Sequence, residues 1–210
     1  MGVAERRARE WAERKSQILN AARKLLFEKG LDGTSVNQIA KRAELSPSAL
    51  YTYFKNKEEI IAALSQEGLD LLHRQAAAEI VSADPPQRRL RQLAGAYWTF
   101  SREQREYFDI INHFLISPRP VLNENLKRMV DRQGEKILAL GLAAVEEGVG
   151  GGIFRDVKPL RFMLMFWAAI NGMIHLEKLQ NTMLGGEDHQ ALYWYAVDSL
   201  IEGISVSSGR

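Results

Sequence analysis

Apolar residues recur every three or four positions along most of the chain, and this spacing predicts helices. The first clear stripe is Ile18, Ala22 and Leu25, with Gly30 just past the expected helix end. Glycine is common there because a left-handed residue often closes a helix. No segment alternates apolar and polar residues long enough to predict a strand. The pattern therefore predicts an all-α fold of about nine helices.

Residues that favour turns divide the remainder into further helical segments. We expect a long helix from about Lys57, a helix carrying Leu90 to Trp98, and further helices at about 107–116, 122–147, 159–183 and 187–206. The breaks are rich in proline or glycine: Asp84-Pro85-Pro86, Ser117-Pro118-Arg119-Pro120, Gly148–Gly152 and Gly185-Gly186. The four glycines within 148–152 predict a flexible connection.

Two short helices joined by a tight turn are predicted between Val36 and about Tyr53. Ser35 is a good N-cap for the first of them, and Gln38 completes a capping box. Ser46 and Pro47 fit the N-cap and first helical position of the second. A longer helix followed by such a pair predicts a helix-turn-helix. In that motif the second helix enters the major groove of DNA.

The net charge of +2 conceals an asymmetry. Residues 1–57 hold 12 Lys/Arg and 6 Asp/Glu, whereas residues 58–210 hold 16 and 20. A basic first part favours an anionic partner, with nucleic acid as the obvious candidate. Charge alone also fits a solvated helix face, because Glu5, Glu10 and Glu13 lie among the arginines.

The stretch TSVNQIAKRAELSPSALYTYFKNKEE, residues 34–59, closely resembles the TetR-type bacterial transcriptional regulators. The matching positions are spread over the whole motif: Ile39-Ala40, Ala43, Ser46, Leu50-Tyr51-Thr52-Tyr53-Phe54 and Lys57-Glu58. The resemblance covers about the first 60 residues. Two positions depart from the pattern, since Glu44 and Ser48 each replace a frequent glycine. The turn at Glu44 must therefore avoid a left-handed residue or accept strain.

The resemblance implies a double-stranded operator as partner and a role for each matching position. Phosphate contacts are expected from Ser35, Tyr51 and Lys57. Contacts near the base edges are expected from Asn37, Ser48, Ala49, Thr52 and Tyr53. With the turn residue Ser46 these form the expected DNA interface. Arg6, Arg7 and Arg9 form either a basic arm on the DNA or a disordered, solvated tail.

The resemblance further implies a DNA-binding domain at 1–57 and a ligand-binding and dimerisation domain at 58–210. The stretch 162–170 is apolar on every face and must be covered on all sides. The last helix carries an apolar stripe that we expect in a homodimeric four-helix bundle: Tyr193, Trp194, Val197, Leu200, Ile201 and Ile204. The alternative is that this stripe belongs to the core of the monomer.

A ligand pocket needs apolar walls and a few polar groups. Candidate walls are Trp98, Tyr107, Phe108, Phe114, Met129, Phe162 and Phe166, and candidate polar anchors are Asn112, His113, Asn171 and His175. A lone histidine is, however, more often a core or surface residue than a ligand contact. The apolar content around 162–167 predicts a small, largely apolar or aromatic effector.

Other function classes lack their residues. The chain has no cysteine, and its four histidines are scattered, so we expect no metal site and no cofactor. It has no phosphate-binding glycine loop after a strand and no nucleophile elbow, so we expect no enzyme. The first 15 residues lack the apolar core of a secretory signal. The longest apolar run, nine residues, is half of a membrane span, which predicts a cytoplasmic protein without a membrane partner.

The leading interpretation is a dimeric, sequence-specific DNA-binding regulator, a repressor released from its operator by the effector. The alternative is a helical small-molecule or lipid-binding protein without a DNA function. Salt-dependent binding of a duplex distinguishes the two.

Overall fold

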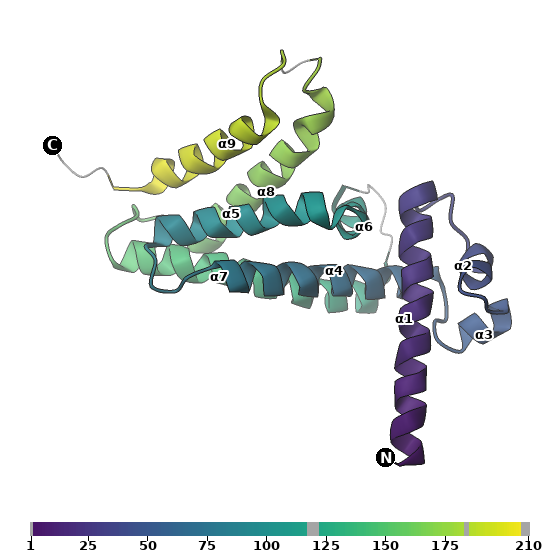
Figure 1. Ribbon diagram of the computed structural model, residues 1–210. Coiled ribbons are helices and arrows are strands. Elements are labelled where there is room, and N and C mark those ends of the chain that lie inside the picture. The colour runs from purple at the N-terminus through teal and green to yellow at the C-terminus, as the bar shows by residue number, and fades with distance from the viewer. Residues whose placement is uncertain (1, 117–121, 183–184, 207–210) are drawn as a thin grey trace. The chain divides into compact units, whose positions relative to one another are not determined.

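A computed structural model describes residues 2–116, 122–182 and 185–206, with the side chains of 114–116 excepted. These residues form nine α-helices and one short 3-10 helix, so the all-α prediction is confirmed (Figure 1). The helices are α1 (Val3–Lys29), α2 (Val36–Arg42), α3 (Pro47–Tyr51), α4 (Lys57–Glu79), α5 (Pro86–Glu103), α6 (Arg105–Ile116), α7 (Glu124–Gly150), α8 (Pro159–His175), η1 (Leu176–Leu179) and α9 (His189–Ile204). The break predicted at 117–120 lies outside the described residues. None of the described helices combines the length and apolar composition that crossing a bilayer requires.

The chain forms two compact units. The first comprises the described residues up to Asp70 and those between Gln104 and Gln133. The second comprises Leu71–Glu103 and the described residues from Gly134 onward. This division differs from the predicted boundary at residue 57, which stays a prediction.

The core of the first unit joins α1 to the helix-turn-helix. Ile18 and Ala22 of α1, Ile39 of α2 and Leu50 of α3 are fully buried in one cluster, to which Phe54 also belongs. Figure 1 shows α2 and α3 lying along the C-terminal half of α1. The predicted stripe of α1 is therefore the face that positions the recognition helix.

The second unit packs α5, α8 and α9 together. The Tyr193 hydroxyl of α9 donates to the Ala94 carbonyl of α5 at 2.7 Å. Phe166 of α8 and Val197 of α9 are fully buried. An exposed ion pair also links Arg91 to Asp198. Apolar packing, a hydrogen bond and an ion pair therefore hold these three helices together.

Two helix ends and one backbone pairing differ from the sequence prediction. α7 continues to Gly150, so Gly148 and Gly150 are helical, and only Gly151 and Gly152 form the turn. α8 ends at His175 and passes into η1, whereas the sequence predicted a helix that continues to about residue 183. Phe154 and Ser205 form an isolated antiparallel bridge. The bridge is set by pairing across residues far apart in the sequence, which local periodicity does not detect.

Candidate nucleic-acid interface

The N-terminus of α2 is held by its capping box. The Gln38 amide donates to the Ser35 hydroxyl at 3.3 Å, and the Ser35 amide donates to the Gln38 side chain at 2.9 Å. The predicted capping box is therefore present. Ser35 and Asn37 are both exposed, which leaves their edge of α2 accessible to a large partner.

The turn between α2 and α3 is a Schellman motif with Glu44 at its left-handed position. Glu44 has φ 56, the only positive φ at a non-glycine residue among the described residues. The Leu45 amide donates to the Ala40 carbonyl at 2.9 Å, and the Glu44 amide to Lys41 at 3.2 Å. This hydrogen-bond pair defines the motif. Of the two outcomes expected for Glu44, the strained left-handed one is observed.

The recognition helix α3 is short and begins at a capped serine. Ser46 accepts from the Ala49 amide at 3.2 Å, and its hydroxyl lies 3.0 Å from that of Ser48. Thr52 donates to the Ala49 carbonyl at 2.7 Å. Tyr51 is 49% exposed, and Ser46, Ser48 and Thr52 are also exposed. Because Leu50 is buried, α3 presents one polar face outward.

Two further interface candidates, Tyr53 and Lys57, already make contacts within the chain. Tyr53 is half-buried, and its ring stacks on Trp11 of α1 with centroids 4.2 Å apart. The Lys57 ammonium is half-buried and donates to the Leu31 carbonyl. Burial lowers the pKa of Lys57, and the Asp32 carboxylate opposes that shift. Lys57 therefore anchors the loop after α1 as the structure stands.

Two contacts that hold the motif were not found from the sequence. The buried Thr34 hydroxyl lies 2.8 Å from the Gly30 carbonyl and 3.2 Å from the Leu25 carbonyl, which fixes the end of α1. Arg42 of α2 forms a two-armed ion pair with Glu28 of α1, at 2.6 and 2.8 Å. The Arg42 guanidinium lowers the pKa of Glu28. Both contacts join residues of different elements, so periodicity gives no signal for them.

Five of the eleven ligand candidates lie in the second unit, where they already have partners. Phe162 and Phe166 are buried and stack with centroids 5.7 Å apart. Asn171 accepts from the Tyr97 hydroxyl at 2.6 Å. His175 lies with Nδ1 2.8 Å from the Asn171 carbonyl oxygen.

The other candidates lie in the first unit. Phe108 and Asn112 are buried on α6, and the Asn112 amide donates to the Phe108 carbonyl at 3.0 Å. Tyr107 donates to Glu67 at 3.2 Å. Met129 on α7 is exposed. Phe114 was also expected in a pocket wall, but its side chain lies outside the described residues.

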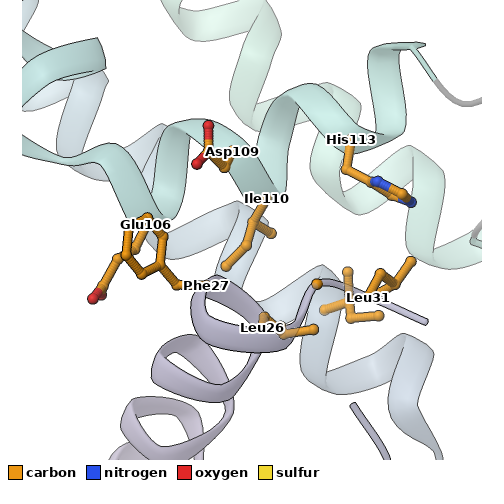
Figure 2. A pocket seen from close by; sticks show the side chains of 9 residues that line it. Leu26, Phe27, Leu31, Glu106, Asp109, Ile110 and His113 are labelled. Atoms are coloured by element: carbon orange, nitrogen blue, oxygen red, sulfur yellow. The ribbon is translucent and has the colours of Figure 1, made fainter. Parts of the chain in front are cut away.

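His113 lines a pocket of about 230 Å³ within the first unit. Figure 2 shows side chains of α6 facing the end of α1 across this pocket. Its lining residues are Leu26, Phe27, Gly30, Leu31, Ile61, Glu106, Asp109, Ile110 and His113. The lining is mostly apolar but includes the carboxylates of Glu106 and Asp109 and the imidazole of His113. Glu106 is already paired with Arg23. Of the ligand candidates whose side chains are described, His113 alone lines this pocket.

A buried histidine that the sequence analysis did not single out, His189, organises one end of the second unit. Its Nε2 lies 2.7 Å from the Met173 carbonyl, so Nε2 carries the proton. Nδ1 then accepts from Arg102 at 2.9 Å. The Trp98 ring packs beside the His189 ring. The Arg102 guanidinium lies over Trp98, 4.4 Å from the centroid of the Trp98 ring. Trp98 therefore helps to join α5 to α9.

Of the six residues of the predicted dimer stripe on the last helix, four are buried by the chain itself, and Trp194 and Leu200 are half-buried. Tyr193, Val197, Ile201 and Ile204 are buried within the chain itself. The exposed apolar side chains lie elsewhere: Leu160, Leu164 and Met165 on α8 and Tyr195 on α9. The periodicity located the apolar stripe correctly, but it could not tell whether the chain or a second copy covers it. Among the described residues no cluster of His, Asp and Glu could hold a metal ion.

Comparison with known proteins gives two family matches that together cover most of the chain. Residues 18–64 match the model described as bacterial regulatory proteins of the tetR family. Residues 90–200, more than half of the chain, match the tetracyclin repressor-like C-terminal domain.

Individual proteins resemble the chain over nearly its whole length. The HTH-type transcriptional regulator YerO of Bacillus subtilis is 24% identical over 93% of this chain and 67% of its own. FadR of Bacillus subtilis, solved with stearoyl-CoA, has a TM-score of 0.74 at 20% identity and covers 90% of this chain and 98% of its own. AibR, solved with isovaleryl coenzyme A and operator DNA, has a TM-score of 0.70 at 21% identity, covering 91% and 98%. At these identities the two structures show a shared fold.

Proposed function

The chain belongs to the TetR family of DNA-binding transcriptional regulators, and from that premise we propose that it is a dimeric repressor released from its operator by a small acyl-bearing effector. The family consists of regulators and not of enzymes. Membership therefore favours a DNA-binding protein over the alternative of a helical ligand carrier without a DNA function.

The observation that carries the proposal is the polar, exposed face of α3 on a braced helix-turn-helix. Ser48 and Thr52 lie on this face and are proposed to meet base edges, as are Asn37 of α2 and Ala49. The exposed Tyr51 and Ser35 are proposed as phosphate contacts, which fix the register on the duplex. Ser46 acts through the cap that orients α3.

Lys57 and Tyr53 are proposed in modified roles. Lys57 must leave the Leu31 carbonyl to reach a phosphate, so its contribution to affinity is reduced by the bond it gives up. Tyr53 has one face covered by Trp11. Tyr53 is therefore proposed to orient α1 relative to α3 and not to contact bases.

Dimerisation is proposed through the exposed apolar face of α8 and α9. Leu164 is 48% and Tyr195 is 73% exposed in the single chain. Exposed apolar groups gathered on two adjacent helices are typical of an interface. A two-fold dimer would place two α3 helices about 34–36 Å apart, or a multiple of that, on a near-palindromic operator.

The effector is proposed to be an acyl-coenzyme A or a related acyl compound. Two proteins of the same fold were solved with stearoyl-CoA and with isovaleryl coenzyme A. An acyl ligand is proposed to insert between apolar and polar side chains of the second unit: Trp98, Phe162, Phe166, Asn171 and His175. The first-unit candidates Tyr107, Phe108, Asn112, His113 and Met129 are secondary in this proposal.

Release requires that the effector favour a state that binds DNA less well. α4 begins at Lys57 in the first unit and ends at Glu79 in the second. A shift of this helix is the proposed link from ligand to α3. A tenfold loss of operator affinity needs about 1.4 kcal/mol of coupling, and DNA must weaken effector binding by the same factor.

The test is a titration of operator-bound protein with acyl-coenzyme A compounds of increasing chain length, with free coenzyme A as the control. We expect at least one chain length to lower operator affinity tenfold or more. His175→Ala should weaken that compound's binding while leaving operator affinity in its absence unchanged. If a compound binds tightly yet operator affinity stays constant, the proposed release mechanism is wrong.

A further inference from the structure

The first turns of α1 extend well beyond the core of the first unit. α1 has 27 residues, but its first buried residue is Ile18. Residues 2–14 are all exposed. At 1.5 Å per residue the part before Ile18 is about 20 Å long. Figure 1 shows this part continuing past α3 to the N-terminus.

One aromatic contact connects this extension to the helix-turn-helix. Trp11 stacks on Tyr53, two residues after α3, with ring centroids 4.2 Å apart and an interplanar angle of 30°. One turn further along α1, the Lys15 ammonium lies 5.1 Å from the centroid of the Phe54 ring. Short helices without tertiary contacts are marginal in water. The stack therefore fixes the direction of the extension relative to α3.

Positive side chains predominate on one face of the extension. Residues spaced by three, four or seven positions share a face. Arg7, Arg14 and Lys15 are thus on the face of Trp11 and Ile18, which is the face toward α3. Glu5 and Glu13 project from the other sides, whereas Glu10, three residues from Arg7 and four from Arg14, borders this face and pairs with Arg6.

The pairing of the arginines follows the same division. Arg6, on the far side, forms an ion pair with Glu10 at 3.5 Å. Arg14 donates to the neutral Gln17 at 2.8 Å, and within the described residues it forms no ion pair. In the described part of the chain no carboxylate pairs with Arg7. Arg7 and Arg14, both exposed, therefore leave positive charge on the α3 side of the extension. Lys15 is half-buried beside the Phe54 ring and interacts with the Glu67 carboxylate.

We propose that this face, formed by Arg7 and Arg14, is a second phosphate-binding surface for the operator duplex, and that the Trp11–Tyr53 stack positions it. The inference rests on the proposed operator binding by α3. Its partner is the DNA backbone because the face is continuous with the exposed side of α3 and opposite in charge to phosphate. Trp11 and Tyr53 act here as positioning residues.

Such a surface contributes affinity without sequence preference, since phosphates are the same at every base pair. Each neutralised phosphate adds about 0.9 to the slope of log affinity against log salt concentration. Two arginines therefore contribute about 1.8 to the slope for each bound protomer.

The experiment compares two double variants of equal charge change on the full-length protein. Arg7→Gln with Arg14→Gln alters the proposed surface, and Arg6→Gln with Arg9→Gln alters the far side. Operator affinity is measured from low to moderate salt. We expect the slope to fall by about two per protomer in the first variant and to stay near the wild-type value in the second. Base preference should be unchanged in both.

Trp11→Ala separates positioning from charge. We expect it to lower the slope as the first double variant does, to add little in combination with that variant, and to be rescued by Trp11→Phe. Circular dichroism reports whether α1 stays helical. Equal slopes for the two double variants would overturn the inference. A wild-type protein without salt-dependent operator binding would instead overturn the proposed function.

Discussion

The ring of Phe154 occupies the space that a side chain at Gly148 would need. A Cβ at Gly148 would lie 2.1 Å from Cδ2 and 2.4 Å from Cε2 of Phe154. Phe154 is 2% exposed, and its amide donates to the Gly148 carbonyl at 2.9 Å. The glycine-rich stretch therefore serves close packing at the end of α7, where the sequence predicted only flexibility.

Gly148→Ala should destabilise the protein because the buried ring has to move. We expect a loss of about 1–3 kcal/mol in the free energy of unfolding, the range for overpacked cores. Gly150→Ala is the matched control, since a Cβ there meets nothing within 4 Å. Chemical denaturation measures both variants. Equal stability of the two would contradict this account of the glycine.

Glu44→Gly should stabilise the helix-turn-helix. Glu44 holds a left-handed conformation with φ 56, which costs an ordinary residue about 1–2 kcal/mol. Glycine avoids that cost but has more freedom in the unfolded chain, so we expect a net gain of about 0.5–1 kcal/mol. Glu44→Ala, which keeps the strain, should give no gain. A less stable glycine variant in thermal unfolding would refute the strain argument.

Glu67→Gln should change the pH dependence of stability. Partial desolvation raises the pKa of the Glu67 carboxyl although the residue is exposed overall, and the Tyr107 hydroxyl and the charges of Arg23 and Lys15 offset this only in part. A carboxyl with a raised pKa favours folding while it is protonated, and this contribution is lost as pH rises through the folded-state pKa. The glutamine cannot ionise and still accepts from Tyr107.

We therefore expect Glu67→Gln to be slightly more stable than the wild type at neutral pH, because solvent screens much of the effect at this exposed residue. The difference should disappear below about pH 4, where the carboxyl is protonated in the unfolded chain as well. Urea denaturation at a series of pH values measures this. A stability difference that does not change with pH would show that ionisation is not its cause.

Leu164→Glu and Tyr195→Glu should weaken the dimer without unfolding the chain, since both side chains are exposed in the monomer. A charge at the centre of an apolar interface should raise the dimer dissociation constant at least tenfold, or about 1.4 kcal/mol. Val81→Glu is the control, an exposed apolar residue between α4 and α5. Sedimentation equilibrium gives the constants. Three variants with wild-type association would place the interface elsewhere.

The helix-turn-helix could be predicted from the sequence because its determinants are local. Ser35 with Gln38 and Ser46 with Pro47 mark helix starts within four residues. The buried positions Ile39 and Leu50 follow directly from helical spacing. Even the strain at Glu44 was one of two outcomes that a missing glycine allowed.

Features set by contacts between distant segments could not be predicted in the same way. The Trp11 ring covers Tyr53, and His189 bridges Arg102 and Met173. Each pairing depends on where two elements meet, and a single sequence gives no record of that. The same limit explains why the stripe around Val197 was assigned to a dimer, although the chain buries it itself.

The most direct test of the central claim, that the exposed face of α3 reads the operator, is selection of duplexes from a random pool. The wild type should select a near-palindromic sequence. Tyr51→Phe should select the same sequence with lower affinity, because a phosphate contact carries no base information. Thr52→Ala should select different bases, at about 1–3 kcal/mol of discrimination per altered contact. An unchanged selected sequence for Thr52→Ala and for Ser48→Ala would contradict the account.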